Sequence, residues 1–428
     1  MKRVLQSKKP LRGEISVPGD KSIGHRAVIF GSIAHGLSRV SNMSGGEDNL
    51  RTVQAFKDLG VKISTEGETL YIQGKGWEGL TAPKNIIDCG NSGTTMRLLS
   101  GVLAGRPFTT MLDGDQSLRR RPMQRVIEPL RRMGANLVGR EGPGLAPLEI
   151  NGGSLKGIEY SMPIASAQVK SAILLAGLQA EGVTIVQEPQ NSRNHTELMI
   201  KGFGGEVALD GRKILLKGGQ TLHGKGVRIP GDMSSAAFFL VAAALIPGSQ
   251  VIVRRVGVNP TRDGVVEILR RMGAEIELLG ATIETGEPVA DLKVKGTRLR
   301  GVEIGSELAA RTIDEYPILA IAAALADGVT VIHGAKELRF KESDRISAMS
   351  EGLRRLGVDV DEREDGMTIR GRETLQGNKV RSFGDHRIAM SLAVAGLCAE
   401  GGVEIDDADC VAISFPTFFG LLDEICLP

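Results

Sequence analysis

The sequence predicts an α/β protein of two compact domains, each containing three repeats of two helices and several short strands. The length is the first indication, because 428 residues exceed what one ordinary hydrophobic core holds and favour two or more compact units. The second is a pattern that recurs six times along the chain: a short polar segment, a helical stretch rich in Ala and Leu, and a glycine before a β-like stretch. Six repeats divide naturally into three per domain.

The first helix of each repeat is apolar on nearly all sides, which predicts a buried helix. The polar residues at its start recur at intervals of 68 to 80 residues, at Ser22, Ser92, Ser166, Ser234, Asp314 and His386. So regular an interval indicates an internal repeat rather than chance.

The second helix of each repeat is amphipathic and closes into a strand. Its end appears as FKDLGVKI, LRRMGANL, IKGFGGEV, LRRMGAEI and LRRLGVDV. A glycine after the last helical turn is the expected left-handed cap, and the β-branched or apolar residues that follow favour a strand. The C-terminal FPTFFGLLDEI predicts a sixth such helix without its strand.

Composition excludes several classes of protein. Lys and Arg number 53 and Asp and Glu 51, a net charge of +2, so nothing global indicates a nucleic acid or an anionic membrane as partner. Four scattered cysteines form no CxxC pair, which favours reduced thiols in a cytoplasmic protein. We find no secretory h-region and no apolar stretch long enough to span a bilayer. A phosphate loop, an HExxH motif, zinc-spaced Cys and His residues and a dinucleotide fingerprint are also missing from the sequence.

Several helix starts carry Ser, Asn or Asp, which cap free backbone N–H groups. A helix N-terminus also favours anions, so several such ends directed at one place would form an anion site. For any single start, a cap on a core helix is the simpler interpretation. The charged residues beside these starts favour the anion site.

The N-terminal half carries four candidate segments. PGDKSIGHRA places Lys21 and Arg26 where both side chains can reach one phosphate or carboxylate, with a solvated basic surface as the alternative. GNSG places Gly93 where backbone amides can approach a ligand. In the run before Pro122, which suits the first turn of a helix, we expect Arg121 to turn inward and Arg119 and Arg120 to face solvent. Two neutral donors stand at another helix start, Ser166 and Gln168.

The C-terminal half carries three. Asp314 precedes an apolar helix and by itself is interpreted as an N-cap. In FKESDR, Lys341 and Arg345 would share a face of a helix, and an exposed ladder of salt bridges is the alternative. Charged residues directly before the last apolar helix serve no packing purpose. The start of this helix, with Asp385, His386 and Arg387, is therefore predicted to belong to a functional site.

Taken in order, six segments resemble the enolpyruvyl transferase family, and within it the 5-enolpyruvylshikimate-3-phosphate synthases. They are PGDKSIGHRA, GNSGTTMR, RRRPM, SAQVKSAILLAG, FKESDR and FGDHRIAM, and the resemblance covers essentially the whole chain. It implies two domains, each a pseudo-threefold assembly of βαβαββ units around buried parallel helices, an inside-out α/β barrel. Residues 1–19 and 229–428 would form one discontinuous domain and 20–228 an inserted domain, with the active site in the cleft between them.

The resemblance also implies an activity: transfer of the enolpyruvyl group of phosphoenolpyruvate to the 5-hydroxyl of shikimate 3-phosphate. This is a step of chorismate and aromatic amino acid biosynthesis that needs no cofactor and no metal. The residues that match shikimate 3-phosphate contacts are Lys21, Ser22, Arg26, Ser166, Gln168, Arg193, Asp314 and Lys341. Those that match phosphoenolpyruvate contacts are Lys21, Gly93, Arg121, Gln168, Arg345 and Arg387. The expected partners are these two small molecules, with neither nucleic acid nor membrane, and the expected state is a monomer.

The chemistry needs two proton transfers, which two carboxyl groups in unlike environments can divide. We expect Asp314 to remove the proton of the attacking hydroxyl and Glu342 to protonate the methylene group, with a pKa that rises when the site closes. Lys21 would stabilise the leaving phosphate, and His386 would assist the elimination.

The chain departs from the better-known branch of this family at two places. Ile413 stands where that branch has a lysine, and Glu337 where it has an asparagine. Both changes resemble the divergent branch and leave the exact hydrogen bonds open. Gly93 differs from the alanine of glyphosate-insensitive members, so we expect glyphosate to inhibit this enzyme.

Two alternatives remain from the sequence. A sister enzyme transfers enolpyruvyl to UDP-N-acetylglucosamine with a reactive loop cysteine, but MLDGDQSLRRRPM has none, and Cys89 is expected to be buried. The other alternative is an inactive repeat scaffold for anionic partners, which would have lost Asp314 or Glu342.

Overall fold

The computed structural model describes all residues except 1, 5, 8, 141–143 and 427–428. The chain divides into two compact units. Unit 1 comprises residues 1–18, 230–283 and 288–428, and unit 2 comprises residues 19–229 and 284–287. Unit 1 is therefore discontinuous in sequence, and each unit is described by itself below.

Unit 2 alternates helices with short strands. Its elements are α1 (Lys21–Ile33), β3 (His35–Ser41), α2 (Glu47–Asp58), β4 (Lys62–Glu66), β5 (Thr69–Lys75), η1 (Trp77–Gly79), β6 (Ile87–Asp88), α3 (Gly93–Leu103), β7 (Thr109–Asp113), η2 (Leu118–Arg120), α4 (Gln124–Arg132), β8 (Asn136–Arg140), β9 (Leu145–Asn151), β10 (Glu159–Ser161), α5 (Ala167–Gly177), β11 (Val183–Gln187), α6 (His195–Gly202), β12 (Ala208–Asp210), β13 (Lys213–Lys217) and β14 (Gly226–Arg228).

Unit 1 repeats the same succession. Its elements are β1 (Lys2–Val4), β2 (Arg12–Ser16), α7 (Met233–Leu245), β15 (Gln250–Gly257), α8 (Gly264–Arg271), β16 (Glu275–Glu284), β17 (Glu287–Lys295), β18 (Glu303–Ile304), η3 (Ser306–Leu308), α9 (Ala309–Thr312), α10 (Tyr316–Ala324), β19 (Val329–Ile332), η4 (Lys336–Phe340), α11 (Arg345–Arg355), β20 (Asp359–Arg363), β21 (Gly366–Arg370), β22 (Leu375–Gln376), β23 (Lys379–Arg381), α12 (His386–Cys398), β24 (Ala399–Glu400), β25 (Val403–Asp406), η5 (Ala408–Ile413) and α13 (Phe418–Cys426).

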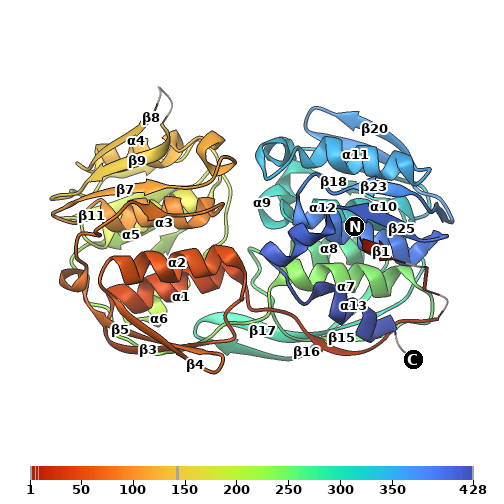
Figure 1. Ribbon diagram of the computed structural model, residues 1–428, viewed down its shortest axis with the longest axis horizontal. Helices are drawn as coiled ribbons and strands as arrows, with labels where there is room; N and C mark the ends of the chain where they lie inside the picture. Colours follow the sequence, from red (N-terminus) through yellow and green to blue (C-terminus); the bar gives the residue numbers. More distant parts are fainter. Residues whose placement is uncertain (1, 5, 8, 141–143, 427–428) are drawn as a thin grey trace. The chain divides into compact units, whose positions relative to one another are not determined.

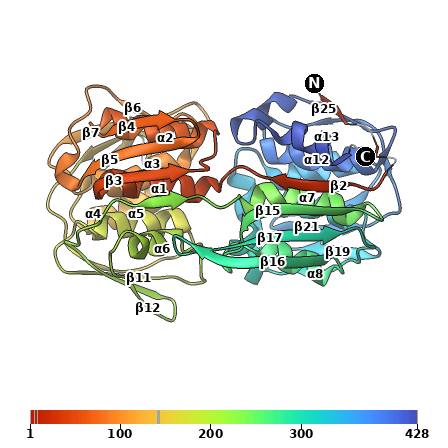
Figure 2. The same cartoon turned by 90° about the horizontal axis from the view of Figure 1, so that it is seen from below.

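The sheets are small and mixed, and they follow one scheme. In the sheet β10-β11-β13-β12, for example, the first two strands are parallel and the remaining pairs antiparallel. In two repeats the first strand comes from a segment distant in sequence. β14 lies parallel to β3, and β2 lies parallel to β15. Figure 2 shows β2 beside β15. The predicted sixth helix is α13, and β1 pairs antiparallel with β25 of the same repeat.

The first helix of each repeat is buried, as the apolar pattern predicted. In unit 1, α7, α10 and α12 contact one another, and in unit 2 α3 lies against α5 (Figure 1). Every residue of α10 is buried. Each unit has its own hydrophobic core around these helices.

The glycines that follow the second helices have the predicted left-handed conformation. Their φ angles lie between +81° and +109°, at Gly60, Gly134, Gly204, Gly273 and Gly357. A residue with a Cβ is strained at such an angle, so these glycines end the amphipathic helices where the pattern placed their ends.

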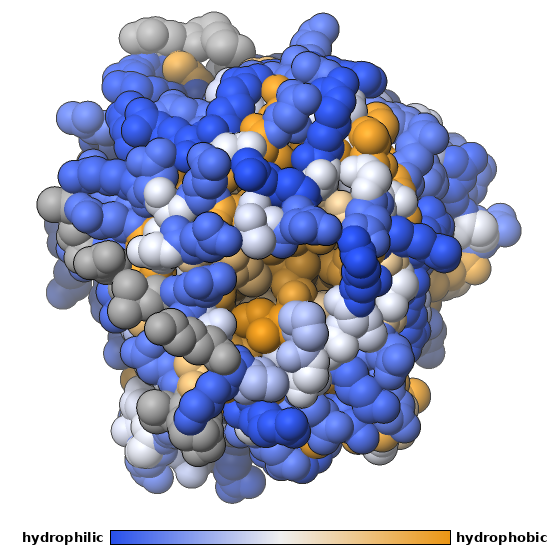
Figure 3. All heavy atoms as spheres, turned by 90° about the vertical axis from the view of Figure 1, so that its right-hand side faces the viewer, coloured by the Kyte–Doolittle hydropathy of each residue, from blue (hydrophilic) through white to orange (hydrophobic). Residues whose placement is uncertain are grey.

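The surface of unit 1 that faces the viewer in Figure 3 is mainly hydrophilic, with hydrophobic atoms gathered near its centre. Apolar atoms contribute more than half of the accessible surface of a typical folded protein. Among the described helices, none combines the length and the hydropathy that crossing a membrane requires.

Candidate active site

The starts of the helices in unit 2 are linked by polar side chains. Lys21 is the first residue of α1, whose N-cap Asp20 accepts a hydrogen bond from the backbone N of Ile23 at 2.8 Å. The Nζ atom of Lys21 lies 2.8 Å from Oδ2 of Asp48, in the first turn of α2. Sequence reasoning missed Asp48, although its place two residues after the glycine pair Gly45 and Gly46 was a signal for a helix start.

Arg26 lies one turn further along α1 and is buried. It donates to Oγ1 of Thr196 at 2.7 Å, to Oγ of Ser171 at 2.6 Å and to the backbone O of Ser22 at 2.9 Å. Burial lowers its pKa to about 10, which still leaves it cationic at neutral pH. Arg26 thus links α1 to α5 and α6, and it also binds the backbone of Ser22 in its own helix.

The start of α3 brings together three predicted residues and one that was missed. Arg97 donates to Oε1 of Gln168 at 2.6 Å, and Nε2 of Gln168 donates to Oγ1 of Thr94 at 2.9 Å. A Cβ atom on Gly93 would lie 2.9 Å from Nη1 of Arg97 and 3.5 Å from Nη1 of Arg121. Gly93 therefore leaves room for two guanidinium groups.

The arginine run divides as predicted. Arg119 and Arg120 are exposed, whereas Arg121 is half-buried and donates to Oδ1 of Asn91 at 2.8 Å. The prediction for Pro122 was wrong, because α4 begins at Gln124 with Met123 as its N-cap. Pro122 lies in the irregular segment before α4 and is not part of the first helical turn.

The remaining predicted residues of unit 2 stand at or near helix starts. Ser166 is the N-cap of α5, and its hydroxyl accepts from the backbone N of Val169 at 3.4 Å. Arg193 lies just before α6. The pKa of Arg26 is lowered mainly by the burial of Arg26 and also by the positive charge of Arg193. Cys89 is buried, as expected, and this burial raises the pKa of its thiol.

A buried series of hydrogen bonds joins α1, α2 and α3. Nδ1 of His25 lies 2.6 Å from Oγ1 of Thr52, which lies 2.8 Å from Oγ1 of Thr95, itself 2.8 Å from Oγ of Ser92. Burial lowers the pKa of His25 to about 3, so the imidazole is neutral at physiological pH. These hydrogen bonds fix α1, α2 and α3 relative to one another.

In unit 1, Asp314 faces three cations. Its Oδ1 atom lies 3.5 Å from Nη1 of Arg345 and 4.0 Å from Nζ of Lys341, while its backbone O accepts from Nη1 of Arg387 at 3.1 Å. The side chain of Asp314 is 16% exposed. A carboxylate that is partly accessible and surrounded by cations is suited to a substrate site.

Arg345 is the centre of this cluster. It is buried and donates to Oε2 of Glu342 at 2.6 Å and to Oδ2 of Asp385 at 2.8 Å. Burial opposes the charge of Asp385, but Arg345 outweighs that effect and holds the pKa of Asp385 below its ordinary value. Asp385 is the N-cap of α12, so His386 and Arg387 begin that buried helix.

Two local predictions in this region were wrong. Asp314 is not an N-cap, because α10 begins at Tyr316 after Glu315, and the Asp314 carboxylate faces the cations. Lys341 and Arg345 do not share a helical face, because α11 begins at Arg345 and Lys341 follows η4. The two cations reach Asp314 from a loop and a helix start.

The residues that depart from the better-known branch lie elsewhere on unit 1. Glu337 is in η4, and Ile413 ends η5 with 39% of its surface exposed.

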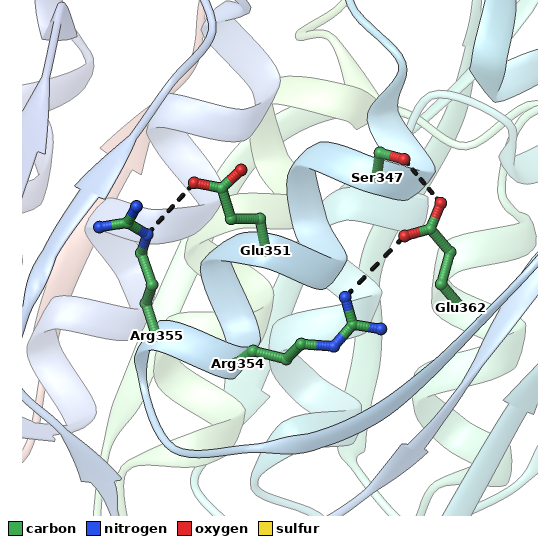
Figure 4. Close-up of a pocket in the computed structure, with 5 residues that line it drawn as sticks. All are labelled: Ser347, Glu351, Arg354, Arg355 and Glu362. Atoms are coloured by element: carbon green, nitrogen blue, oxygen red, sulfur yellow. Dashed lines mark hydrogen bonds and ion pairs between the residues drawn. The ribbon is translucent and has the colours of Figure 1, made fainter.

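A pocket of about 490 Å³ lies on α11 and β20 (Figure 4). Its walls carry ion pairs between Glu351 and Arg355 at 3.2 Å and between Arg354 and Glu362 at 4.0 Å, and Ser347 donates to Glu362. The predicted site residues do not line it. Its charges neutralise one another, so we do not assign the site to it. Within the described residues, no cluster of His, Cys, Asp and Glu side chains suits a metal ion.

The profile of the family EPSP synthase (3-phosphoshikimate 1-carboxyvinyltransferase) matches residues 5–422. The chain belongs to the EPSP synthase family. The 3-phosphoshikimate 1-carboxyvinyltransferase of Geobacter metallireducens is 54% identical over 417 residues, 97% of each chain. That of Bacillus cereus is 50% identical over 415 residues, again 97% of each chain.

Solved structures agree with this assignment. The EPSP synthase of Acinetobacter baumannii matches with a TM-score of 0.90 at 47% identity, over 99% of this chain and 97% of that one. The enolpyruvyl transferase NikO of Streptomyces tendae matches with a TM-score of 0.79 at 16% identity, over 98% of this chain and 96% of that one, and shows the fold alone.

The enzyme therefore has EPSP synthase activity, in the shikimate pathway of aromatic amino acid biosynthesis. Its substrates are phosphoenolpyruvate and shikimate 3-phosphate, as the EPSP synthase identity implies. The predicted family and fold class are confirmed. The transferase for UDP-N-acetylglucosamine and the inactive scaffold are set aside.

Proposed function

We propose that the enzyme joins its substrates by addition and elimination through a tetrahedral intermediate, and that the helix starts of both units act on the same substrates. The observation that carries the proposal is the surroundings of Asp314. Nη1 of Arg345 is buried beside it and has no hydrogen-bond partner among the described residues. A buried donor in need of an acceptor next to an accessible carboxylate is suited to an anionic substrate.

Asp314 is the proposed base for the 5-hydroxyl of shikimate 3-phosphate. Lys341, with its Nζ atom 4.0 Å from Oδ1 of Asp314, is proposed to orient the substrate. Glu342, held by Arg345, is the proposed proton donor to the methylene group of phosphoenolpyruvate, and His386 assists the elimination. Two carboxyl groups thus divide the two proton transfers.

The arginines hold phosphoenolpyruvate. Arg345 and Arg387 of unit 1 bind it together with Lys21, Gly93, Arg121 and Gln168 of unit 2. Such preorganised cations stabilise the charge that develops on the leaving phosphate. Shikimate 3-phosphate contacts Lys21, Ser22, Arg26, Ser166, Gln168, Arg193, Asp314 and Lys341.

The enzyme is further proposed to work as a monomer in the cytoplasm. Its cysteines Cys89, Cys398, Cys410 and Cys426 are free thiols, and burial raises the pKa of Cys410 and Cys426 to about 11, which keeps them protonated and unreactive. Light scattering at micromolar concentration should give the mass of one chain; a stable mass of two chains would contradict this.

An assay of phosphate release with both substrates tests the role of Asp314. Asp314→Asn should lower kcat by about 10²- to 10⁴-fold, the usual contribution of a general base, while circular dichroism remains unchanged. Asp361→Asn is the matched control, because Asp361 pairs with Arg370 on an exposed strand. Near-normal turnover in Asp314→Asn would remove it as the base.

A further inference from the structure

A second buried ion cluster lies at the starts of α7, α8 and α10 in unit 1. Arg262 donates from Nη1 to Oε1 of Glu315 at 2.8 Å and from Nη2 to Oδ1 of Asp232 at 3.1 Å. The hydroxyl group of Ser234 contacts both Arg262 and Glu315. Arg262 is 3% exposed and Glu315 is fully buried, and both acids that pair with Arg262 belong to the protein itself.

This cluster has the same plan as the one around Arg345. In both, an arginine at the start of the second helix of a repeat contacts an acid at the first helix of its own repeat and an acid of the next repeat. For Arg262 the two acids are Asp232 and Glu315. For Arg345 they are Asp314 and Asp385. Glu315 and Asp314 are consecutive residues, so the two clusters meet at the proposed base.

Asp314 lies in a short segment that no helix fixes, because α9 ends at Thr312 and α10 begins at Tyr316. Side chains on both sides tie this segment to the start of α8. Glu315 binds Arg262, as described above. Arg311 binds Glu267 at 2.7 Å and also Asp263, the N-cap of α8.

We propose that Arg262 is a positioning residue for the reaction: by holding Glu315, it keeps the carboxylate of Asp314 directed at Lys341 and Arg345. The inference rests on the proposed role of Asp314. Without Arg262, Glu315 would be a buried charge with its main cation missing, which is strongly unfavourable. The segment would move to relieve it, and a catalytic group displaced by about 1 Å loses on the order of 10²-fold in rate.

Steady-state kinetics of Arg262→Gln, Arg262→Lys and Glu315→Gln test this. In Arg262→Gln, kcat should fall at least about tenfold while both KM values stay within about twofold, because a misplaced base weakens the transition state more than substrate binding. Arg262→Lys retains the charge and should recover part of kcat. Glu315→Gln, which keeps its volume, should also lower kcat and provides a second variant if Arg262→Gln does not fold.

The control is Asp291→Asn, which weakens the ion pair between Asp291 on β17 and Arg254 on β15. All rates are measured well below the melting temperature of each variant and are corrected for the folded fraction. Unchanged kcat in both Arg262→Gln and Glu315→Gln, or losses that follow only the folded fraction, would overturn the inference. Asp314→Asn is assayed in parallel: if it is inactive while Arg262→Gln is normal, only the inference fails, and if it is active, the proposed base fails.

Discussion

At the scale of single residues, Gly93 shows how a missing side chain determines the space in a site. The two guanidinium groups nearest to it belong to Arg97, which binds Gln168, and to Arg121, which binds Asn91. A methyl group at this position would displace the end of Arg97 first, because 2.9 Å is closer than real contacts of a Cβ atom. The space that Gly93 leaves beside Arg97 and Arg121, where phosphoenolpyruvate is predicted to bind, would then be smaller.

Gly93→Ala should weaken inhibition by glyphosate more than it weakens the use of phosphoenolpyruvate. A displacement that costs about 1.4 kcal/mol weakens binding about tenfold, so the inhibition constant should rise by at least about that factor. Inhibition is measured by phosphate release at several phosphoenolpyruvate concentrations. Equal inhibition of Gly93→Ala and the unmodified enzyme would contradict the placement of Gly93.

Sequence reasoning found the residues whose chemistry shows in their own segment. Lys21 and Arg387 are charges in the first turn of buried apolar helices, a combination that packing does not explain. It missed Asp48, Arg97, Arg262 and Glu315, whose partners stand in other segments: Asp48 meets Lys21 across 27 residues and Arg262 meets Glu315 across 53. No periodicity within one segment encodes such a pair.

At the scale of helices and strands, repeat and cap signals predicted the elements well, because glycine is required by the backbone itself. The failures at Pro122, Asp314 and Lys341 have a common cause. Each lies in a short irregular segment before a helix, where tertiary contacts rather than local preference decide the first helical residue. For Asp314 these contacts are the ion pairs with Lys341 and Arg345.

The chain of hydrogen bonds from His25 through Thr52 and Thr95 to Ser92 makes stability depend on pH. Burial lowers the pKa of His25 from 6.5 to about 3 in the folded state. Between these values the unfolded chain binds a proton that the folded protein does not bind. The free energy of unfolding should therefore fall as the pH drops from 6.5 towards 3, by up to about 1.4 kcal/mol per pH unit from this group.

His25→Asn keeps a polar atom near Nδ1 and removes the titration. Urea unfolding of both proteins at pH 7.5, 6.0 and 5.0 measures the effect. The unmodified protein should be the more stable at pH 7.5, and its advantage should shrink steadily at the two lower values. A difference that stays constant across the three pH values would show that folding does not lower the pKa of His25, and would contradict the prediction.

At the scale of the whole molecule, two separate hydrophobic cores make the units independent bodies in terms of stability. The core of unit 2 lies entirely within residues 23–229. The short piece 284–287 contributes a buried pair between Nδ1 of His195 and Oε1 of Glu287 at 2.7 Å. A single continuous fragment therefore holds nearly everything unit 2 needs to fold.

The fragment of residues 19–229 should unfold cooperatively on heating and release no phosphate from the substrates, because Asp314 and Arg345 are absent. Circular dichroism and the phosphate assay measure the two properties. Phe56→Ala within the fragment is the control for a packed core, since Phe56 is fully buried and its loss should cost about 3 to 5 kcal/mol. A gradual transition that Phe56→Ala leaves unchanged would contradict independent folding.

The strand pairings of the N-terminal segment also determine the order of events during synthesis. β2 pairs with β15, more than 230 residues later, and β1 pairs with β25, about 400 residues later. Domains generally fold as they emerge, the N-terminal ones first, but here β1 and β2 are made before unit 2 and their partner strands after it. Unit 2 can finish while β1 and β2 still lack neighbours. The strand edge of β2 stays unsatisfied until residues 250–254 have been made, and β1 lacks its partner until residues 403–405 have been made.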